Sequence, residues 1–561
     1  MDLFKQDNAE IIFVALGGIG EIGMNCGLYG FGSKKKRKWL MVDLGISFPD
    51  ASLPGVDTIL PDVSFAKTIK DDILGLIITH GHEDHYGAVL DFAYELDIPV
   101  YGTSFLKGML YAKAEAYQSD TMPQFIQIDS NEDVQLNSDI RFSLIPVSHS
   151  IPESNAIFLK SSYGNLVHTG DWKLDKNPVI GTPTSLEQFT DIGAQDILAV
   201  ISDSTNAWRE GVSPSEGEVV GGFEKIFSTS ERRVIITQFS SNIARIKSIY
   251  LAAQAAGREV IIAGRALARN IQVAQELGVL DPNYRFLSDT AFQDLPAQNV
   301  AILCTGSQGE SRAQMKKIAD KAHPIIKLAQ GDLVVFSSRA IPGNEKEIGA
   351  IQNSLVKQGV DIVTADNERV HVTGHPFRGE IEQLYQALKP KYVVPAHGEA
   401  WHLNQHKIFA EREGYQVAPI AYNGNILKLA PGTPEIIGTV AHGQWCRDGN
   451  IRIDTQSASI RERRKLSYNG IVFANIILDH QNEMMAEPDV RMEGIPYDDE
   501  FGLDIEEKVI ETIEGAIYSI PKSRRKELEK VEEAVRRSIR NEINRLWGKK
   551  PLCHVIISKI V

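Results

Sequence analysis

Residues 80–85 constrain this chain more than any other segment. They read His80-Gly81-His82-Glu83-Asp84-His85 and follow an apolar run, Ile73–Ile78, that is typical of a buried strand. His80 and His82 are two apart on an extended segment, so they project to one side and can chelate one ion. Asp84 and His85 face a neighbouring site at the start of a helix that we expect near Tyr86. Imidazole and carboxylate ligands suit zinc or manganese. A chance cluster of histidines is a weak alternative, because the 561 residues contain only 14.

Three more metal-competent side chains stand where other apolar runs end. His149 follows Phe142–Val147, Asp171 follows the run around Leu166-Val167, and His397 follows Tyr392–Pro395. A layered α/β fold gathers its site at the ends of its strands. Any one of these residues alone would more often be structural, but three in this order indicate a single site with the 80–85 loop.

The fold class follows from the alternation of short apolar runs with helical patterns, which predicts buried strands and an α/β protein. The expected strands are Ile11–Leu16, Trp39–Val42, Ile73–Ile78, Phe142–Val147, Ile197–Ser202, Val234–Thr237, Val260–Ala263, Val300–Leu303, Leu333–Phe336 and Tyr392–Pro395. The length predicts two to four domains.

A glycine motif near the amino terminus offers a competing interpretation. Gly18-Ile19-Gly20-Glu21-Ile22-Gly23 matches the dinucleotide fingerprint, and Asp43 lies 20 residues after the last glycine. That fingerprint requires a helix after the third glycine. The residues that follow, up to Phe31, favour another strand, and the basic run 33–38 favours a hairpin tip. We therefore expect no nucleotide site here.

Composition narrows the setting. The four cysteines are widely separated, which fits a reducing compartment and neither a disulfide framework nor a thiolate zinc site. The first residues lack a signal-peptide pattern, and no apolar run approaches the roughly 20 residues of a membrane span. We expect a cytoplasmic protein without a membrane partner. The net charge of −14 disfavours a passive nucleic-acid coat, although residues 521–550 carry 11 Lys or Arg against 5 Asp or Glu.

The 80–85 motif, together with His149 and Asp171, resembles the HxHxDH signature of the metallo-β-lactamase superfamily and its downstream partners. Asp43 is similar to the acid of that family that supports the ligands from behind. The resemblance implies two divalent metals, with zinc favoured and manganese the alternative. The first metal would be held by His80, His82 and His149, the second by Asp84, His85 and His397, with Asp171 bridging them.

The long gap between Asp171 and His397 must contain an inserted domain, and it resembles the β-CASP insertion of nucleic-acid-processing members. Asp203, in Ser202–Asn206, matches its first acidic motif, and His375, in His371–His375, matches its histidine motif. A histidine at the position of His397 goes with members that act on RNA rather than DNA. The resemblance makes His375, Asp84 and Asp203 the expected catalytic residues.

The chain is also similar to the bacterial ribonuclease J family over about residues 8–450, and more loosely beyond. Gly17–Asn25, Thr305–Glu310 and His371–His375 carry this resemblance. It implies 5′–3′ exonuclease and endonuclease action on RNA in mRNA decay and rRNA processing. It also implies a homo-oligomer, as a dimer or tetramer, and partners in an RNA-decay complex.

The same resemblance predicts a substrate-phosphate pocket, because small polar residues beside free backbone N–H groups suit an oxyanion. An ordinary helix N-cap at Ser240 or Ser241 is the alternative for the first segment. Pro376-Phe377-Arg378 departs from the small residues expected, so Arg378 is a candidate replacement. Arg245, Lys247, Arg265 and Arg269 are candidate channel cations. The expected pocket residues are Ser240, Ser241, Asn242, His371, Val372, Thr373, Gly374 and His375.

The expected architecture is an αββα metallo-β-lactamase sandwich with an inserted α/β β-CASP domain and a small C-terminal α/β domain. In the tail we expect a strand at Ile471–Leu478, a helix at Ser523–Trp547 and a strand at His554–Ile560, with a role in dimerisation. The expected boundaries are 1–217 and 370–450 for the core, 218–369 for the insertion, 451–465 for a linker and 466–561 for the tail.

The sequence features disfavour three alternative functions. A hydrolase of small thioesters or lactams needs no clamping insertion. A non-catalytic RNA-binding protein is expected to have lost a ligand, and none is missing from the sequence. Another β-CASP nuclease, including one that acts on DNA, is disfavoured by His397.

Overall fold

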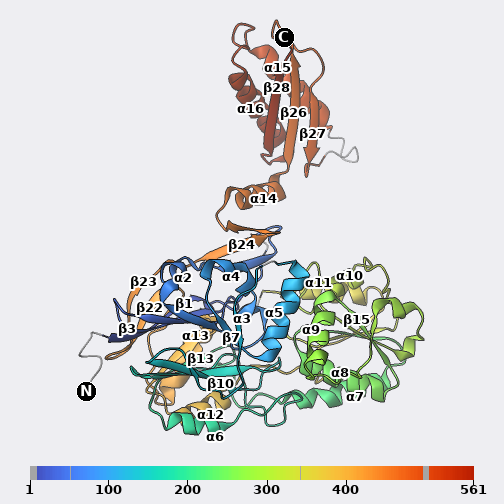
Figure 1. The fold of residues 1–561 in the computed structure, drawn as a ribbon. Helices are drawn as coiled ribbons and strands as arrows, with labels where there is room; N and C mark the ends of the chain where they lie inside the picture. Colours follow the sequence, from blue (N-terminus) through green and yellow to red (C-terminus); the bar gives the residue numbers. More distant parts are fainter. Residues whose placement is uncertain (1–8, 51, 120, 342, 497–503, 561) are drawn as a thin grey trace. The chain divides into compact units, whose positions relative to one another are not determined.

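The computed structural model describes residues 9–50, 52–119, 121–341, 343–496 and 504–560. Two mixed sheets lie face to face in its first part (Figure 1). One has the strand order β23 (Glu435–Thr439), β22 (Asn425–Ala430), β1 (Ala9–Gly17), β3 (Cys26–Ser33), β4 (Lys38–Val42), β6 (Ile73–Ile77), β7 (Val100–Gly102) and β8 (Phe125–Gln127). The other has the order β20 (Tyr392–Ala396), β13 (Ile197–Asp203), β12 (Asn165–His168), β11 (Asn155–Ser161), β10 (Ile140–Pro146) and β9 (Val134–Gln135).

The hydrophobic core lies between these sheets. Phe13 and Tyr29 from the first sheet and Leu144 and Leu159 from the second are fully or almost fully buried in one cluster. Helices α6 (Leu186–Gly193) and α12 (Arg378–Leu388) cover the outer face of the second sheet. On the opposite side lie α2 (Ser64–Thr68), α4 (Val89–Leu96) and α5 (Ser104–Tyr117) (Figure 1). The αββα sandwich is therefore confirmed.

A second α/β domain is inserted after β13. Its sheet is parallel throughout, in the order β16 (Phe286–Ser288), β15 (Glu259–Ala263), β17 (Val300–Cys304), β14 (Val234–Thr237), β18 (Leu333–Phe336) and β19 (Asp361–Val363). The helices between its strands are α7 (Val219–Thr229), α8 (Ile243–Ala255), α9 (Arg265–Glu276), α10 (Gln314–Ala319) and α11 (Glu345–Val356). A separate buried cluster that includes Ile302 and Val334 forms its core. The insertion predicted from the sequence is confirmed.

The strands on either side of this insertion are neighbours. β20 pairs in parallel with β13, and Asp203 is in register with Ala396. The chain thus leaves the core sheet at the end of β13, builds a complete domain, and returns to the adjacent position. As a result, Asp203 and His397 come together at one edge of the sheet.

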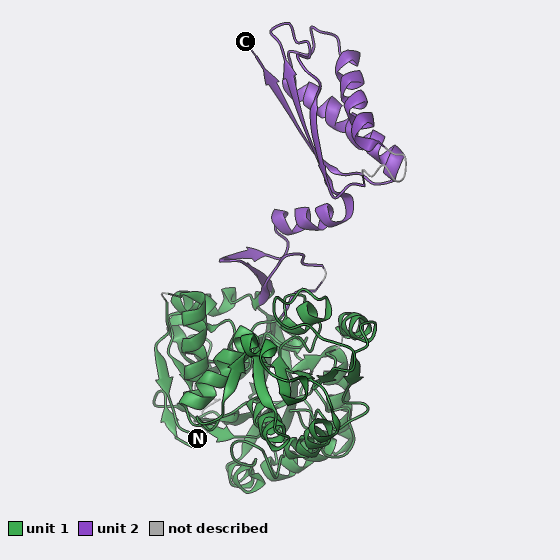
Figure 2. Ribbon diagram, turned by 90° about the vertical axis from the view of Figure 1, so that its right-hand side faces the viewer, with its two compact units in different colours: residues 1–47, 60–443 green, residues 48–59, 444–561 purple. Residues whose placement is uncertain are grey.

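The remaining residues form a second compact unit, made of residues 48–59 and 444–561 (Figure 2). Residues 48–59 thus group with the tail rather than with the core, and a three-stranded sheet contains β5 (Thr58–Pro61), β24 (Gln444–Asp448) and β25 (Ile451–Asp454). The segment expected as a linker contains β25 and the first eight residues of α14 (Ala458–Asn469).

The tail is richer than the strand–helix–strand order predicted from the sequence. β26 (Ile471–Leu478) has the predicted bounds, and β28 (Leu552–Lys559) pairs with it in parallel. The prediction missed β27 (Asp489–Glu493) and α15 (Ile505–Ser519), and α16 (Leu528–Trp547) begins later than expected. The acid-rich first turn of α15 weakens its apolar signal, although Val509, Ile513 and Ile517 bury one face.

Other local predictions agree with the structure. All ten predicted core strands are present, with ends that differ by a few residues. The residues after Gly23 enter β3 rather than a helix, so the glycine motif is not a dinucleotide fingerprint. Within the described ranges, no helix has the length and apolarity that a bilayer crossing requires.

Candidate metal centre

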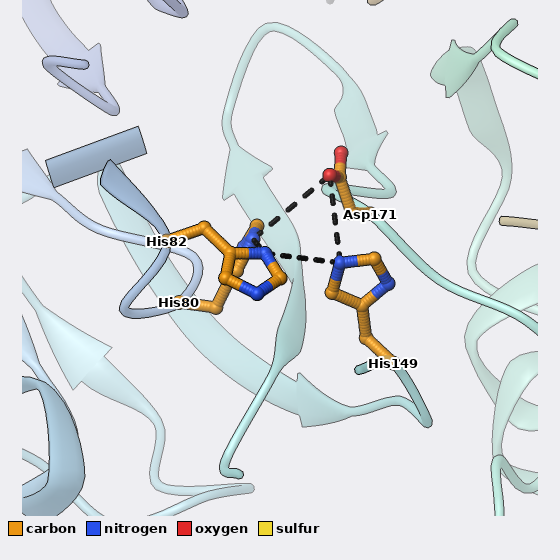
Figure 3. Close-up of side chains that lie close together, drawn as sticks. All are labelled: His80, His82, His149 and Asp171. Atoms are coloured by element: carbon orange, nitrogen blue, oxygen red, sulfur yellow. Dashed lines mark hydrogen bonds and ion pairs between the residues drawn. The ribbon is translucent and has the colours of Figure 1, made fainter. Parts of the chain in front are cut away.

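The residues predicted to hold the first metal lie close together, on three separate segments of the chain (Figure 3). They are His80, His82, His149 and Asp171. His80 Nε2 and His149 Nε2 lie 3.1 and 3.2 Å from His82 Nδ1. Two nitrogens bound to one tetrahedral zinc at about 2.0 Å stand roughly 3.3 Å apart, so these spacings fit a shared ion. Asp171 Oδ2 lies 3.9 Å from His80 Nε2 and 3.7 Å from His149 Nε2.

A second group shares Asp171 with the first. His85 Nε2 lies 3.3 Å from Asp171 Oδ2 and 3.5 Å from Asp84 Oδ2. His397 Nε2 approaches the other oxygen, Asp171 Oδ1, at 3.5 Å. All four side chains can place a ligand atom within 4.8 Å of one another. Asp171 therefore stands between two ligand sets, as a bridging carboxylate must.

Asp171 also has a carboxylate oxygen that is available to a metal. It is 3% exposed, and within the described part of the chain its Oδ1 has no hydrogen-bond partner. A buried carboxylate oxygen without a partner is costly, because folding has removed its water. The donor set of imidazole and carboxylate groups and this free oxygen together fit a pair of divalent cations.

Neutral imidazoles are required for metal binding, and burial supplies them in the first ligand group. Desolvation by burial holds the pKa of His80 and of His82 well below the ordinary histidine value. Burial also lowers the pKa of His149 to about 4, although Asp171 opposes the shift. These three rings are therefore unprotonated near neutral pH, with nitrogen lone pairs available.

Asp43 supports the ligands from behind, as the sequence predicted. Its Oδ2 lies 2.7 Å from His85 Nδ1, which fixes the proton on Nδ1 because a carboxylate only accepts. The lone pair is then on His85 Nε2, the ligand atom, which lies 3.1 Å from Asn25 Nδ2. Its Oδ1 accepts the Thr79 backbone N–H. Asp43 is fully buried with φ of 59°, an uncommon conformation for a non-glycine residue.

Asn25 orients His397, and sequence reasoning missed this role. Its Oδ1 lies 2.8 Å from His397 Nδ1, and its Nδ2 donates to the Asp84 backbone oxygen at 3.0 Å. A Cβ on Gly18 would lie 2.2 Å from Asn25 Oδ1, so glycine is needed for this approach. Asn25 belongs to the Gly17–Asn25 motif, which marks the segment as noteworthy. No pattern in the neighbouring sequence, however, indicates a contact with His397.

His375 lies beside both ligand sets. Its Nδ1 is 2.7 Å from Asp203 Oδ2, so the ring donates to that buried carboxylate and keeps Nε2 free. Burial lowers the pKa of His375, but the carboxylates of Asp203 and Asp171 outweigh it and raise the pKa to about 9. His149 Nδ1 donates to the Gly374 backbone oxygen at 2.7 Å, and a Cβ on Gly374 would lie 2.6 Å from the His149 ring.

Comparison with known proteins gives the family. Four family models match: metallo-beta-lactamase superfamily over residues 20–194, ribonuclease J beta-CASP domain over 231–355, Zn-dependent metallo-hydrolase RNA specificity domain over 360–418 and ribonuclease J C-terminal domain over 458–560. The chain is 44% identical to Ribonuclease J of Sinorhizobium meliloti, with 98% of each chain covered. The chain belongs to the ribonuclease J family.

Other ribonuclease J relatives match over most of their length. Identity is 34% to Ribonuclease J of Mycolicibacterium smegmatis, over 96% of this chain and 95% of the relative. It is 31% to Ribonuclease J2 of Bacillus subtilis, over 99% of this chain and all of the relative. A crystal structure of a protein of unknown function from Enterococcus faecalis has a TM-score of 0.52 at 13% identity, covering 75% of this chain and all of that one. This last likeness concerns the fold alone.

The two segments expected to hold phosphate in this ribonuclease J family member are joined by Arg245. Asn242 is the N-cap of α8, where its side chain accepts the Arg245 backbone N–H. The Arg245 guanidinium lies 2.9 Å from His371 Nδ1 and donates to the Val372 backbone oxygen. Ser240 and Ser241, just before the cap, are half-buried. The helix N-cap is therefore Asn242 and not Ser240 or Ser241, where the sequence suggested it.

One of the predicted cationic roles is wrong. Arg245 is 1% exposed and forms a two-pronged ion pair with Glu216, so it is a structural anchor and cannot line a channel. Arg378 donates Nε–H to the Ala207 backbone oxygen and pairs with Glu210, whose side chain is mostly exposed. Lys247 donates to the Val179 backbone oxygen at 3.3 Å, and Arg265 is exposed.

Replacing Asn25 with alanine is expected to weaken binding of the second metal by about 10- to 100-fold, because the His397 ring loses the acceptor that orients it. A titration of metal-free protein against a chromophoric chelator measures this affinity. Asn423→Ala is the matched control, since Asn423 contacts the same glycine loop through the Ile19 N–H and is not among the ligand groups. Equal affinities in the two variants would contradict the role of Asn25.

Proposed function

We propose that the chain is a metal-dependent ribonuclease that hydrolyses RNA phosphodiesters with two divalent ions, zinc being favoured over manganese. The observation that carries the proposal is the pair of ligand groups that meet at Asp171 in a member of the ribonuclease J family. The clamping insertion supports a polymeric substrate over a small thioester or lactam. Both ligand sets are complete, which speaks against a purely RNA-binding role.

The side chains of the centre are proposed to have two roles, metal binding and orientation of the metal ligands. His80, His82 and His149 are proposed to hold one ion, and Asp84, His85 and His397 the other, with Asp171 between them. When bound, such a metal pair supplies an activated water and neutralises charge on the scissile phosphate. Asp43 and Asn25 fix the ring orientations of His85 and His397, so the ligand lone pairs are aligned before substrate arrives.

His375 is proposed to act on the phosphate or leaving group. Asp203 accepts from its Nδ1, so the ring's free Nε2 is the only atom it can present to substrate. The side chain is 21% exposed while Asp203 is buried, which supports His375 as the member of the pair that reaches the substrate. From Nε2 it can stabilise a phosphoryl oxygen or protonate the leaving 3′-oxygen.

The direction of attack is proposed to be 5′ to 3′. The segments around Asn242 and His371–His375 are linked through Arg245, which supports one phosphate pocket beside the metals. A 5′-monophosphate fits such a pocket. A 5′-triphosphate brings more charge and bulk than a small set of N–H and O–H donors can neutralise. Internal cuts then remain as the slower, endonucleolytic route.

Incubation with end-labelled RNA tests this function. RNA with a 5′-monophosphate is expected to give mononucleotides from the 5′ end, while RNA with a 5′-triphosphate gives only slower internal products. Chelator should stop both. Equal rates on the two RNA ends, or a ladder that grows from the 3′ end, would contradict the pocket. No cleavage of either RNA by metal-loaded protein would contradict the ribonuclease itself.

We further propose a cytoplasmic homo-oligomer, a dimer or tetramer, that acts in mRNA decay and rRNA processing alongside other decay proteins. The C-terminal unit offers a contact surface of its own. Phe473 and Ile556 are 42% and 59% exposed on adjacent strands, β26 and β28, and Phe473 stacks on the His554 ring. Exposed apolar side chains on one sheet face support subunit association.

A further inference from the structure

Two tryptophans are exposed on segments that supply the metal centre. Trp208 is 37% exposed and Trp401 is 52% exposed, and their ring centroids lie 5.5 Å apart at an interplanar angle of 58°. Trp39 and Trp172, by contrast, are buried. A large apolar ring gains free energy when it leaves water, so a pair of exposed indoles in contact indicates a surface that receives something flat and apolar.

The pair continues into a longer stack. The Arg209 guanidinium lies 4.6 Å from the centroid of Trp208 and 5.4 Å from that of Phe377. Phe377, Arg209, Trp208 and Trp401 thus form a run of planar groups, here called the aromatic ladder. Phe377 belongs to Pro376-Phe377-Arg378, the stretch that departs from the pattern expected after the histidine motif, so the ladder gives that departure a structural role.

The ladder is built on the segments that carry the site. Phe377 is two residues after His375, and Trp208 is five residues after Asp203. Trp401 is four residues after His397, at the second residue of α13 (Ala400–Arg412). Each of the three rings therefore follows a residue of the centre at short range.

The loop before Trp208 is also held in place by the centre. The Ser204 backbone N–H donates to the Ala396 oxygen at 2.9 Å, and Asn206 Nδ2 donates to Thr373 Oγ1 at 2.9 Å. Trp208 and Arg209 are thus tied to the two segments that present His397 and His375. A ligand on the ladder would be anchored at a fixed offset from those histidines.

The charge of the ladder points to an anion beside the flat ligand. Within the described part of the chain, Arg209 Nε is buried and has no hydrogen-bond partner. Burial lowers the pKa of Arg209, and the nearby positive charge of Arg339 lowers it further. Two neighbouring guanidiniums suit a phosphate beside them. A planar ring joined to a phosphate is the chemistry of a nucleotide in a single strand.

We propose that the aromatic ladder is a base-stacking subsite for unpaired nucleotides of the RNA strand that reaches the metal centre. This inference rests on the proposed ribonuclease function. Every base has a flat face, so such a subsite tolerates all sequences but excludes bases held in a duplex. The ladder thereby selects single-stranded RNA beside the scissile linkage.

The test measures binding to the full-length, metal-loaded protein. The probe is a short single-stranded RNA with phosphorothioate linkages, which slow cleavage, and its partner is an oligonucleotide of the same length and charge without bases. Wild-type protein should bind the base-bearing probe more tightly and show quenching of tryptophan fluorescence with that probe alone. Trp401→Ala should weaken base-bearing binding by about 5- to 150-fold, the range measured for loss of one stacking ring, and leave abasic binding unchanged.

Matched variants separate stacking from other effects. Trp401→Phe keeps a ring and should restore most of the preference for bases. Tyr94→Ala removes a side chain that is 83% exposed on α4, outside the ladder, and should change nothing. On unmodified RNA, Trp401→Ala should raise KM with little change in kcat, because stacking binds substrate and transition state alike.

The outcomes are distinct. If Trp401→Ala keeps the wild-type preference for bases, the ladder does not bind RNA, whereas ordinary cleavage by the same preparation would leave the ribonuclease function standing. If the variant changes the mass measured by light scattering and leaves base preference intact, the occupant is a second copy of the chain and the inference is wrong. If Trp401→Ala does not fold, base-specific quenching in the wild type and in Trp401→Phe decides. Failure of the wild type to bind or cleave any RNA would overturn both proposals.

Discussion

Replacing Asp84 with alanine is expected to abolish RNA hydrolysis while the protein stays folded. Its carboxylate oxygen lies 3.5 Å from His85 Nε2 in the second ligand group, so its loss removes one of only four ligands there. The side chain is 31% exposed and lies outside the hydrophobic clusters. Without this carboxylate the second group would hold its cation less tightly, and the activated water that the metal pair would supply would be lost.

Three measurements on one preparation check this expectation. Elemental analysis should find the second metal depleted, circular dichroism should find the spectrum of the folded protein, and labelled RNA should remain intact. Glu115→Gln, which removes an exposed carboxylate on α5, is the control and should retain activity. Wild-type cleavage by a folded Asp84→Ala protein would rule out the two-metal assignment.

Replacing His375 with alanine is expected to lower turnover by roughly 10²–10⁴ and to leave both metals in place. This range is typical for loss of a general acid or of a donor to a phosphoryl oxygen. His375 makes its 2.7 Å hydrogen bond to Asp203 rather than to a ligand of either metal group. Single-turnover kinetics on 5′-monophosphorylated RNA measures the loss.

Asp203→Asn gives the matched comparison, since it removes the charge that orients His375 and keeps the side-chain size. If the two residues act as one unit, the double variant should be no slower than His375→Ala alone. Metal content decides between two roles, because Asp203, His375 and His397 can also bring three ligand atoms within 4.8 Å. A His375→Ala protein that lacks a metal would make His375 a ligand instead.

Much of this architecture was predictable because the candidate ligands directly follow apolar runs that form strands. Buried strands such as Val234–Thr237 are short apolar runs, and their ends are marked by polar residues. The ligand groups were predictable for the same reason, since His149, Asp171 and His397 each follow such a run. Their assembly needs only the rule that strand ends share an edge.

The residues that sequence reasoning missed or misassigned act across long separations. Asn25 meets His397, and Arg245 meets Glu216 and His371, but no local pattern encodes either pairing. A lone arginine in a helix resembles a surface charge, so burial of Arg245 could not be read from its neighbours. The same holds for Phe377, whose partner Arg209 lies on the far side of the inserted domain in sequence.

The pairing of β13 with β20 has a consequence for folding during translation. His397 follows β20, which can join the sheet only after the whole inserted domain has been synthesised. The amino-terminal ligands emerge early, but the second ligand set stays incomplete until then. Pairing over such a sequence distance is also slow to form. A nascent chain that has not yet reached residue 397 lacks one ligand of the second set and is therefore expected to be inactive.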